Sequence, residues 1–461
     1  MGKATGKTER VSPSDKLNIA AVGIGGMGHS NLNEMATENI VALCDIDWRY
    51  SARTFNEFPK AKRYWDYRKM YEEMGKSIDA VLVATADHSH ALIAAEAMTL
   101  GKHVYVQKPL THSVYESRLL TRLADKYNVA TQMGNQGASA GGTNKTLEWL
   151  WNGEIGEVTS VDASTDRPIW PQGLNRPAIE DVIPDTLNWD LFIGSAPMRP
   201  YNNIYHPWNW RGWWDFGTGA LGDMACHILH TAFEGLQLKY PTKVQGTSTV
   251  VMADCCPTAE KVIFTFPERG VKDNLKLPEV KITWYDGGFT PPRPARADGR
   301  DLGNCTIFHG TKDTLICGSH GGDPWLTSGR VPNAPARRRE IKVSHEQDWI
   351  RACKEPAATR VKTASDFSKS GPFNEMVVMG VLAVRLQGLK KELLWDGENM
   401  RFTNIGEDEK LSFRLQNEFT VLNGDPKWNN KDTTPVSARQ FAEELVKHNY
   451  REGWKLPEMP V

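Results

Sequence analysis

Two separate stretches of the sequence contain residue types that can move protons. Lys108 stands in Gln107-Lys108-Pro109, directly after an apolar run that has the length of a strand. Asp223 and His227 are four residues apart after a glycine-rich run, so on a helix they share one face. An imidazole is suited to acid–base work near neutral pH, and an amine can hydrogen-bond a substrate hydroxyl. These residues predict proton transfer by Lys108 and His227, with Asp223 orienting the imidazole and favouring its protonated form.

The same helix permits two other interpretations. Asp223, His227 and His230 have the spacing Asp-x3-His-x2-His, which metal ligands can also have. No glutamate stands between the two histidines and no acidic cluster surrounds them, so we predict no metal. Alternatively, Asp223 is a helix cap and His227 is a hydrogen-bonded histidine of the core. The sequence of this helix, taken alone, leaves that interpretation open.

A glycine motif near the N-terminus predicts a dinucleotide site. The apolar run 17–22 ends in Gly23-x-Gly25-x-x-Gly28, and a helix-compatible run follows. Such glycines permit a tight turn, let the backbone approach a pyrophosphate and let helix and strand pack closely. Backbone N–H groups at the helix N-terminus then face the anion. We therefore expect the pyrophosphate to lie on Gly23, Gly25, Gly26, Met27 and Gly28.

An acidic residue after the next apolar run supports this interpretation. Asp45 follows Ile40–Cys44, twenty residues after Gly25. A carboxylate at that place accepts hydrogen bonds from ribose hydroxyls and repels a 2′-phosphate, which favours NAD over NADP. The alternative is an ordinary glycine-rich turn followed by a solvated aspartate.

Further polar residues follow the later apolar runs of the same region. Ligands of open α/β sheets bind beyond the carboxyl ends of the strands. We therefore expect one set of side chains to flank the cofactor: Thr85, His88, His90, Gln107, Lys108, Asn135 and Gln136. Asp87 or Ser89 can also cap the helix that follows.

These residues need a scaffold, and the first third of the chain predicts one. Strand-like runs at 18–22, 40–44, 63–65, 79–84, 102–106 and 130–133 alternate with helical runs at 68–74, 90–100 and 114–127. This alternation indicates an α/β fold with a doubly wound parallel sheet, which we assign to residues 17–136.

The remaining residues, 137–461, have a different pattern. Strand-like runs at 157–167, 244–253, 261–266, 280–285, 305–309 and 315–317 follow one another without intervening helices, and 376–389 has a helical pattern. Successive strands of this kind indicate a mainly antiparallel sheet and an α+β domain. The segment 168–214, rich in Pro, Asn and Trp, is expected to be a loop built over a site.

Composition excludes several classes of protein. The 461 residues have a net charge of −1, which gives no reason to expect nucleic acid or a membrane surface as a partner. No apolar run approaches the roughly twenty residues that span a bilayer. Seven scattered cysteines without a CxxC pair predict neither a disulfide framework nor structural zinc. Residues 1–16 are polar and are expected to be a disordered lead-in.

The motifs together resemble the Gfo/Idh/MocA oxidoreductase family, which includes glucose–fructose oxidoreductase and inositol dehydrogenase. The resemblance spans about Leu17 to Asn404. The family's glycine motif, its Glu-Lys-Pro motif and its Asp-x3-His motif match here, with Gln107 in place of the glutamate. Its threonine–proline–histidine pattern matches Thr85 and His90, with Ala86 in place of the proline. The segments Leu187–Asp190 and Trp210–Gly219 are similar to a branch abundant in carbohydrate-degrading bacteria.

This resemblance implies an NAD-dependent enzyme that oxidises a ring hydroxyl of a sugar or glycoside, for example at carbon 3. It equally permits an NAD-dependent glycoside hydrolase that oxidises its substrate transiently. A sensor without catalysis is the third alternative, and the presence of both Lys108 and His227 disfavours it. Trp208, Arg211 and Trp214 are expected substrate contacts. The family fold implies an open sheet that builds a homodimer or homotetramer. Members of the branch are often exported, so the periplasm is one expected location and the cytoplasm the other.

Overall fold

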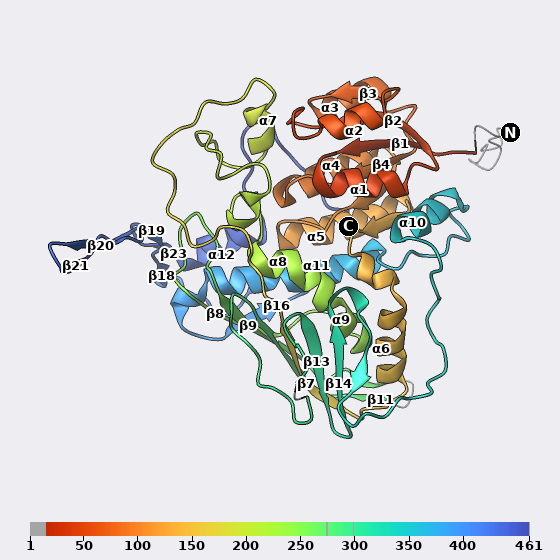
Figure 1. Ribbon diagram of the computed structural model, residues 1–461, viewed down its shortest axis with the longest axis vertical. Coiled ribbons are helices and arrows are strands. Elements are labelled where there is room, and N and C mark those ends of the chain that lie inside the picture. Colours follow the sequence, from red (N-terminus) through yellow and green to blue (C-terminus); the bar gives the residue numbers. More distant parts are fainter. Residues whose placement is uncertain (1–14, 273–274, 298, 461) are drawn as a thin grey trace.

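The computed structural model describes residues 15–272, 275–297 and 299–460, so the expected lead-in 1–16 lies almost wholly outside the described residues. A six-stranded parallel sheet forms the N-terminal part, drawn in red to orange in Figure 1. Its strands are β1 (Asn18–Val22), β2 (Asn39–Cys44), β3 (Lys62–Tyr64), β4 (Ala80–Val83), β5 (His103–Val106) and β6 (Thr131–Met133), in the order β3-β2-β1-β4-β5-β6. The helices between them are α1 (Gly26–Glu34), α2 (Ala52–Glu57), α3 (Tyr67–Met74), α4 (His90–Thr99) and α5 (Val114–Tyr127).

This sheet confirms the predicted doubly wound arrangement. Every residue of β4 and β5 is buried, because helices cover both faces of a parallel sheet. Ser113 and Glu116 form a capping box at the start of α5, which fixes the N-terminus of that helix at the predicted residue. The predicted bounds of the six strands and of α3, α4 and α5 lie within one residue of the observed bounds, whereas α2 was not predicted.

The second sheet has nine strands and is mainly antiparallel, as predicted. Its strands run in the order β15-β14-β13-β7-β12-β9-β8-β16-β17. β7 pairs with β12 in parallel, whereas β12 pairs with β9, β9 with β8 and β13 with β7 antiparallel. The bounds are β7 (Val158–Ser164), β8 (Lys243–Ser248), β9 (Glu260–Phe266), β12 (Val280–Tyr285), β13 (Cys305–Gly310), β14 (Thr314–Gly318), β15 (Trp325–Leu326), β16 (Leu393–Asp396) and β17 (Arg401–Phe402).

The remaining helices follow the first sheet in the sequence. They are α6 (Gly141–Trp151), α7 (Trp189–Ile193), α8 (Gly219–Ile228), α9 (His230–Gly235), α10 (His345–Lys354), α11 (Phe367–Arg385) and α12 (Ala438–Val446). α11 begins nine residues before the predicted helix at 376–389 and includes Pro372. The sequence hides this start because Gly371 and Pro372 disfavour a helix interior. Asp366 caps the helix by accepting from the N–H of Ser368, and packing against α5 and β8 supports it.

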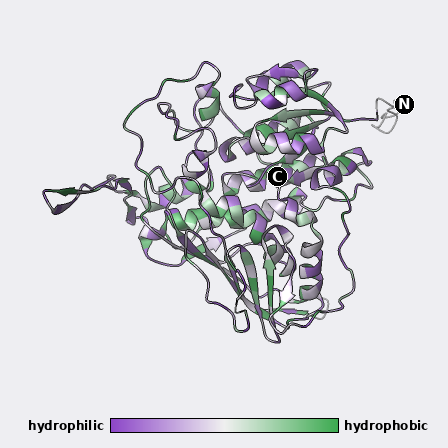
Figure 2. Cartoon of the chain, in the orientation of Figure 1, coloured by the Kyte–Doolittle hydropathy of each residue, from purple (hydrophilic) through white to green (hydrophobic). Residues whose placement is uncertain are grey.

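Small two-stranded pieces complete the fold. β10 (Gly270–Lys272) pairs with β11 (Leu275–Leu277), β18 (Lys410–Leu411) with β23 (Val436–Ser437), β19 (Arg414–Gln416) with β22 (Lys431–Asp432), and β20 (Phe419–Leu422) with β21 (Asp425–Trp428). Figure 1 shows the β20–β21 hairpin projecting from the body of the molecule. In Figure 2 the helix α11 and the central strands are mostly hydrophobic, and the outer loops are mostly hydrophilic. Among the described residues, no helix is both long enough and apolar enough to cross a bilayer.

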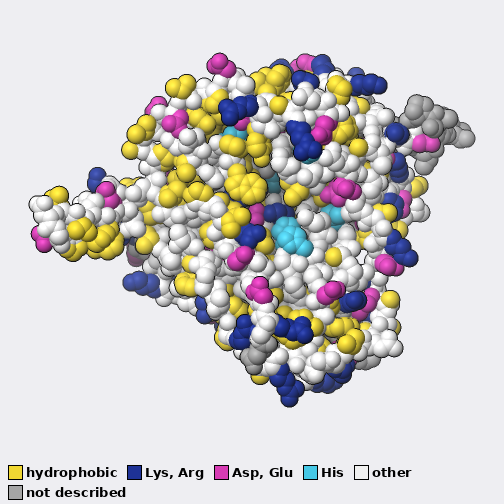
Figure 3. Space-filling model, in the orientation of Figure 1, with side chains coloured by type: hydrophobic (Ala, Val, Ile, Leu, Met, Phe, Trp, Pro, Cys, Tyr) yellow, Lys and Arg dark blue, Asp and Glu magenta, His cyan; other side chains and the backbone are white. Residues whose placement is uncertain are grey.

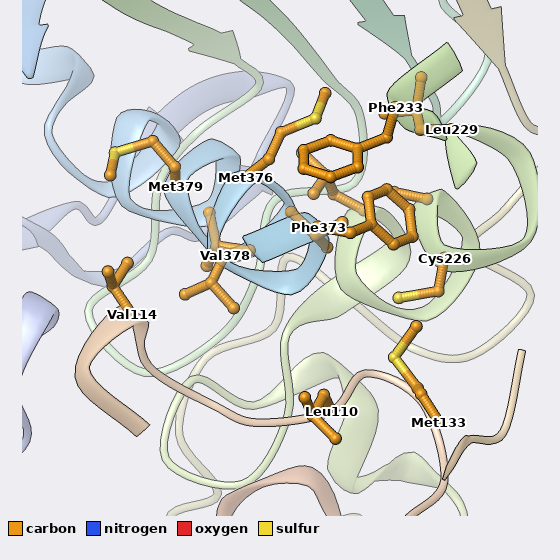
Figure 4. Packing of buried hydrophobic residues seen from close by; sticks show 14 of the residues in the cluster. Leu110, Val114, Met133, Cys226, Leu229, Phe233, Phe373, Met376, Val378 and Met379 are labelled. Carbon is orange, nitrogen blue, oxygen red and sulfur yellow. The ribbon is translucent and has the colours of Figure 1, made fainter. Parts of the chain in front are cut away.

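One hydrophobic core joins the two sheets through their helices. Leu110 and Met133 from the N-terminal part lie in the same cluster as Cys226 of α8 and Phe373 of α11 (Figure 4). Leu110 stands two residues after Lys108, and Cys226 stands next to His227. The packing of this core therefore sets the distance between the two predicted proton-transfer residues.

The chain also returns to the first sheet after building the second. Trp349 of α10 is fully buried beside Tyr105 of β5, with ring centroids 5.7 Å apart. Further along the chain, the ring of Trp454 lies under the guanidinium of Arg68 of α3, 4.2 Å from its centroid. The division at residue 136 therefore separates the two sheets, but α10 packs on the N-terminal one.

Candidate active site and cofactor cleft

The glycine segment after β1 has the geometry of an anion cradle. Gly23 and Gly26 have φ of +78° and +49°, a conformation that other residues rarely adopt. A Cβ at Gly28 would lie 1.9 Å from the carbonyl oxygen of Gly23, so the close approach of helix and turn requires glycine. Gly25 precedes α1 without a side-chain cap, which leaves the first N–H groups of the helix available to a ligand. These features fit a pyrophosphate.

Asp45 lies at the carboxyl end of β2 with its carboxylate held in place. Its two oxygens accept from the backbone N–H groups of Ile24 at 2.8 Å and Asp47 at 2.9 Å. Burial raises the pKa of Asp45, and these two N–H bonds oppose that rise. Each oxygen retains a second lone pair, so the group can still accept from a ribose hydroxyl.

One cavity of about 530 Å³ runs from the glycine segment to α8. Its size is typical of small-molecule sites. The face drawn in Figure 3 shows histidine and basic side chains gathered beside hydrophobic ones near its centre. The predicted site residues that line the cavity are Gly23, Gly25, Gly26, Met27, Asp45, Thr85, His88, Gln107, Lys108, Trp208, Arg211, Asp223 and His227.

Lys108 and Asp223 meet inside this cavity although 115 residues separate them. The Lys108 Nζ lies 2.7 Å from Oδ1 of Asp223 and 3.1 Å from its backbone carbonyl oxygen. The Nε of Arg211 lies 3.2 Å from the same Oδ1. Burial alone would raise the pKa of Asp223, but the charges of Lys108 and Arg211 outweigh it and hold this pKa below its ordinary value. Asp223 is therefore the anion that fixes the two cations.

The predicted contact between Asp223 and His227 is wrong. The carboxylate points to Lys108 and Arg211, while Nδ1 of His227 is buried without a hydrogen-bond partner among the described residues. Burial, followed by the positive charge of Lys108, lowers the pKa of His227 well below its ordinary value. The imidazole is therefore neutral and can accept a proton, contrary to the expectation that Asp223 would favour its protonated form.

His320, which no sequence pattern indicated, lies against His227. The two rings are stacked, with centroids 3.9 Å apart and planes 20° apart. His320 belongs to the short turn Ser319–Gly321, 93 residues after His227, and it also lines the cavity. No spacing rule connects residues so far apart in sequence.

Aromatic side chains form a further part of the cavity wall. Arg211 lies over the rings of Trp208 and Trp210, 4.2 and 4.3 Å from their centroids. Trp170 and Tyr50 also line the cavity and were not predicted. The Tyr50 ring covers the glycine segment, since a Cβ at Gly25 would meet it at 2.3 Å. Trp170, Trp208 and Trp210 belong to the Pro-, Asn- and Trp-rich segment 168–214, which was expected to be a loop built over a site.

Some predicted residues lie elsewhere. Trp214 is 3% exposed and donates its indole N–H to the carbonyl of Met252, so it is part of the core, and its prediction as a substrate contact is wrong. His90 is fully buried between the carbonyls of Pro109 and Thr85, where it braces the Lys108 turn, and burial lowers its pKa to about 4. Asn135 donates to the carbonyl of Cys226, and Gln136 is exposed. Gly28, His90, Asn135 and Gln136 are not among the lining residues.

The metal interpretation of α8 has no geometric support. Within the described residues, no group of three or more His, Cys, Asp or Glu side chains is arranged to hold a metal ion. His230 points away from the pair Asp223 and Lys108, with its Nε2 3.1 Å from the hydroxyl of Thr143.

Comparison with known proteins gives two family matches that together cover more than half of the chain. Residues 17–135 match "Oxidoreductase family, NAD-binding Rossmann fold", and residues 146–274 match "Oxidoreductase family, C-terminal alpha/beta domain". Inositol 2-dehydrogenase of Salmonella paratyphi B is 25% identical over 197 residues, which cover 40% of this chain and 57% of that protein. Glycosyl hydrolase family 109 protein 1 of Akkermansia muciniphila is 29% identical over 119 residues, 23% of this chain and 24% of that protein.

Solved structures share the fold. The WlbA dehydrogenase of Bordetella pertussis, in complex with NADH and UDP-GlcNAcA, superposes with a TM-score of 0.56 at 14% identity. The superposition covers 83% of this chain and 99% of that one. The chain thus spans little more than half the length of the inositol dehydrogenase that it matches in sequence, but nearly all of this structural neighbour.

Proposed function

Because this chain belongs to the Gfo/Idh/MocA oxidoreductase family, with its NAD-binding Rossmann domain at residues 17–135, we propose that it oxidises a ring hydroxyl of a sugar or glycoside. One observation carries the proposal. Lys108 from the first domain and His227 from the second line the same cavity as the glycine segment and Asp45. A substrate hydroxyl beside the redox carbon of a bound dinucleotide then lies between an amine and an imidazole.

Each of these residues has a separate role in the transfer of one proton. His227, held neutral, removes the proton from the substrate hydroxyl. Lys108 donates a hydrogen bond to the same oxygen and stabilises the negative charge that develops there. Asp223 fixes the position of Lys108. NAD supplies the hydride acceptor when it is bound. The glycine segment and Asp45 bind and orient it.

The substrate class is inferred from the aromatic side chains that line the cavity. Trp208 and Trp210 present aromatic faces, and apolar ring faces of sugars stack on such surfaces. The similarity to inositol 2-dehydrogenase agrees with a cyclic polyol or sugar. Oxidation at carbon 3 of a pyranose is the specific form of the proposal.

A direct test measures NADH formation with a panel of pyranoses and pyranosides. Lys108→Ala and His227→Ala should each lower kcat by about a hundredfold or more while NAD binding is retained. Lys145→Ala and His309→Ala are matched controls, since Lys145 is exposed and His309 pairs with Asp162 outside the cavity lining. Full turnover by both cavity variants would refute the assignment. A deuterium isotope effect with substrate labelled at carbon 3 identifies the position.

The similarity to a glycosyl hydrolase of family 109 supports a second candidate. In it, oxidation makes the neighbouring C–H acidic, the aglycone leaves by elimination, water adds, and the same hydride returns to the sugar. Such an enzyme releases sugar without net NADH. Measuring both products with one aryl glycoside separates the candidates, because only the dehydrogenase accumulates NADH in step with consumed substrate.

Assembly and location are also proposed from the family. We expect a homodimer or homotetramer, to be measured by light scattering on the purified chain. We propose the periplasm as the location, with the cytoplasm as the alternative, and fractionation of the source cells would distinguish the two.

A further inference from the structure

His227 lacks the usual means of orienting a catalytic imidazole. A histidine that accepts a proton at one ring nitrogen is ordinarily held by a hydrogen bond at the other. Here Nδ1 is buried without a partner among the described residues, and Asp223 is engaged by Lys108 and Arg211. Something other than a hydrogen bond must therefore fix the plane of this ring.

The His320 ring is the group in contact with that plane. Its centroid lies 3.9 Å from that of His227 with the planes 20° apart, which is the separation of a close stack. The ring is itself anchored, because Oγ of Ser319 lies 2.5 Å from its Nδ1. Its backbone is fixed as well: a Cβ at Gly137 would lie 2.6 Å from Cα of His320, so the turn packs directly on the segment Gln136–Ser139.

The backbone conformation of His320 indicates that this placement is built into the turn. Its φ of 59° and ψ of 30° lie in the left-handed region, which histidine adopts more readily than most residues but at a cost. The neighbouring Gly321 also has a positive φ, and a Cβ there would meet the Thr143 hydroxyl at 2.3 Å. The tight turn aims the ring of His320 at His227.

Electrostatics give the stack a second consequence. Two imidazolium rings in face-to-face contact repel each other, so the pair resists double protonation. The charged or titratable groups that influence His227 besides His320 are Lys108, His230 and His345. Those that influence His320 are Lys108, Asp223 and Arg167. Positive groups outnumber negative ones around both rings, which favours two neutral imidazoles.

We propose that His320 is a positioning residue for the proposed reaction: its ring holds the plane of the His227 ring by stacking. This rests on the proposed function only for the role of His227 as the base. The stacking itself and its effect on the titration of His227 are properties of the protein that do not require turnover.

Two variants separate the ring from the turn. His320→Asn removes the ring and keeps the turn, because asparagine tolerates the left-handed region well. His320→Phe keeps a flat ring for stacking but removes its charge and nitrogens. His309→Asn is the control, since it removes a partly buried histidine that pairs with Asp162 outside the cavity lining. Thermal unfolding of all three shows that they are folded.

The measurements are kcat, KM and the titration of the His227 ring by NMR in the NAD-loaded protein. His320→Asn should lower kcat by roughly ten- to a hundredfold with KM and NAD affinity nearly unchanged. His320→Phe should recover most of that loss. Both should move the titration of His227, and the acid limb of kcat/KM, to higher pH, because in the wild type a proton on His320 in acid repels a second proton on the stacked ring of His227.

Three results would overturn the proposal. Wild-type kcat and titration in His320→Asn would show that the stack does nothing. A His320→Phe variant as slow as His320→Asn would assign the role to the ring nitrogens rather than to stacking. A fall in NAD affinity equal to the fall in kcat would make the turn merely structural. If the wild type turns over no sugar but His320→Asn still shifts the His227 titration, the proposed function fails and the stacking role stands.

Discussion

Replacing Asp223 with asparagine tests whether one carboxylate holds the catalytic amine in place. The substitution keeps the shape of the side chain and removes its charge. Nζ of Lys108 and Nε of Arg211 then converge, without a counter-ion, on an amide that can accept at one atom only. Both cations are largely buried, with 12% and 17% of their side chains exposed, so water replaces the lost partner poorly.

The structure sets the size of the effect. At separations of 2.7 and 3.2 Å and an effective dielectric constant of about 20, the two Coulomb attractions are about 6 and 5 kcal/mol before desolvation is subtracted. Removing one partner of a buried pair costs about 3–5 kcal/mol in proteins. If about 4 kcal/mol of this is lost from the positioning of Lys108 in the transition state, kcat falls by roughly a thousandfold.

The assay follows NADH formation by absorbance with the best sugar found in the substrate panel, and NAD affinity separately by quenching of tryptophan fluorescence. We expect kcat to fall about a thousandfold and NAD affinity to change little, because Asp45 and the glycine segment are untouched. Asp162→Asn is the matched control, since it breaks the pair with His309 outside the cavity lining. An Asp223→Asn enzyme within about threefold of wild type would refute the reasoning, because an effect that small corresponds to well under the 1.4 kcal/mol of a tenfold change.

Three further predictions concern cofactor binding, pH dependence and stability. Asp45→Ala should weaken NAD binding about ten- to a hundredfold in calorimetry, because charge-assisted hydrogen bonds to the ribose are lost. An unchanged Kd would show that Asp45 does not bind the ribose. Burial raises the pKa of Asp87 to about 7, so folded Asp87 keeps a proton that the unfolded chain releases, and the free energy of unfolding falls between about pH 4 and 7. Asp87→Asn should remove on the order of 4 kcal/mol of that fall, and identical slopes of melting temperature against pH in the variant and the wild type would contradict it. Glu375→Gln should lower the free energy of unfolding in urea by about 3–5 kcal/mol, because it leaves Arg118 of α5 buried without its bidentate partner, and a loss below about 1 kcal/mol would show that the pair is unimportant.

Local patterns gave the N-terminal domain almost completely. Alternating apolar runs predicted β1 to β6 and α3 to α5, because strand and helix periods are properties of consecutive residues. The helices α2, α6, α7, α9, α10 and α12 were not predicted, and α11 was predicted too short. Ser344, Asp366 and Ser437 cap α10, α11 and α12, but a single cap residue is a weak signal in a sequence. Contacts with residues far away in sequence also support these helices, as Tyr105 supports Trp349 of α10.

The candidate site was predicted in part for the same reason. The lining positions of Lys108, Asp223 and His227 were predicted, because each stands at the end of a recognisable strand or on a helix face. The contacts among these three residues were predicted wrongly. Helical spacing suggested that Asp223 serves His227, whereas the packing of α8 against Leu110 and Met133 brings its carboxylate to Lys108.

By itself, the sequence determined the type of site: a glycine turn shaped for pyrophosphate, an acid for a ribose, and an amine and an imidazole for a proton. These follow from short spacings, and the physics of turns and helices acts over a few residues. Tertiary structure alone decided that Trp214 lies in the core, that Asp223 pairs with Lys108, and that His320 stacks on His227. Of these contacts, only the pair of Asp223 and Lys108 joins the two domains, and the other two join distant segments of the second domain. Residues tens of positions apart have no local pattern that records their meeting.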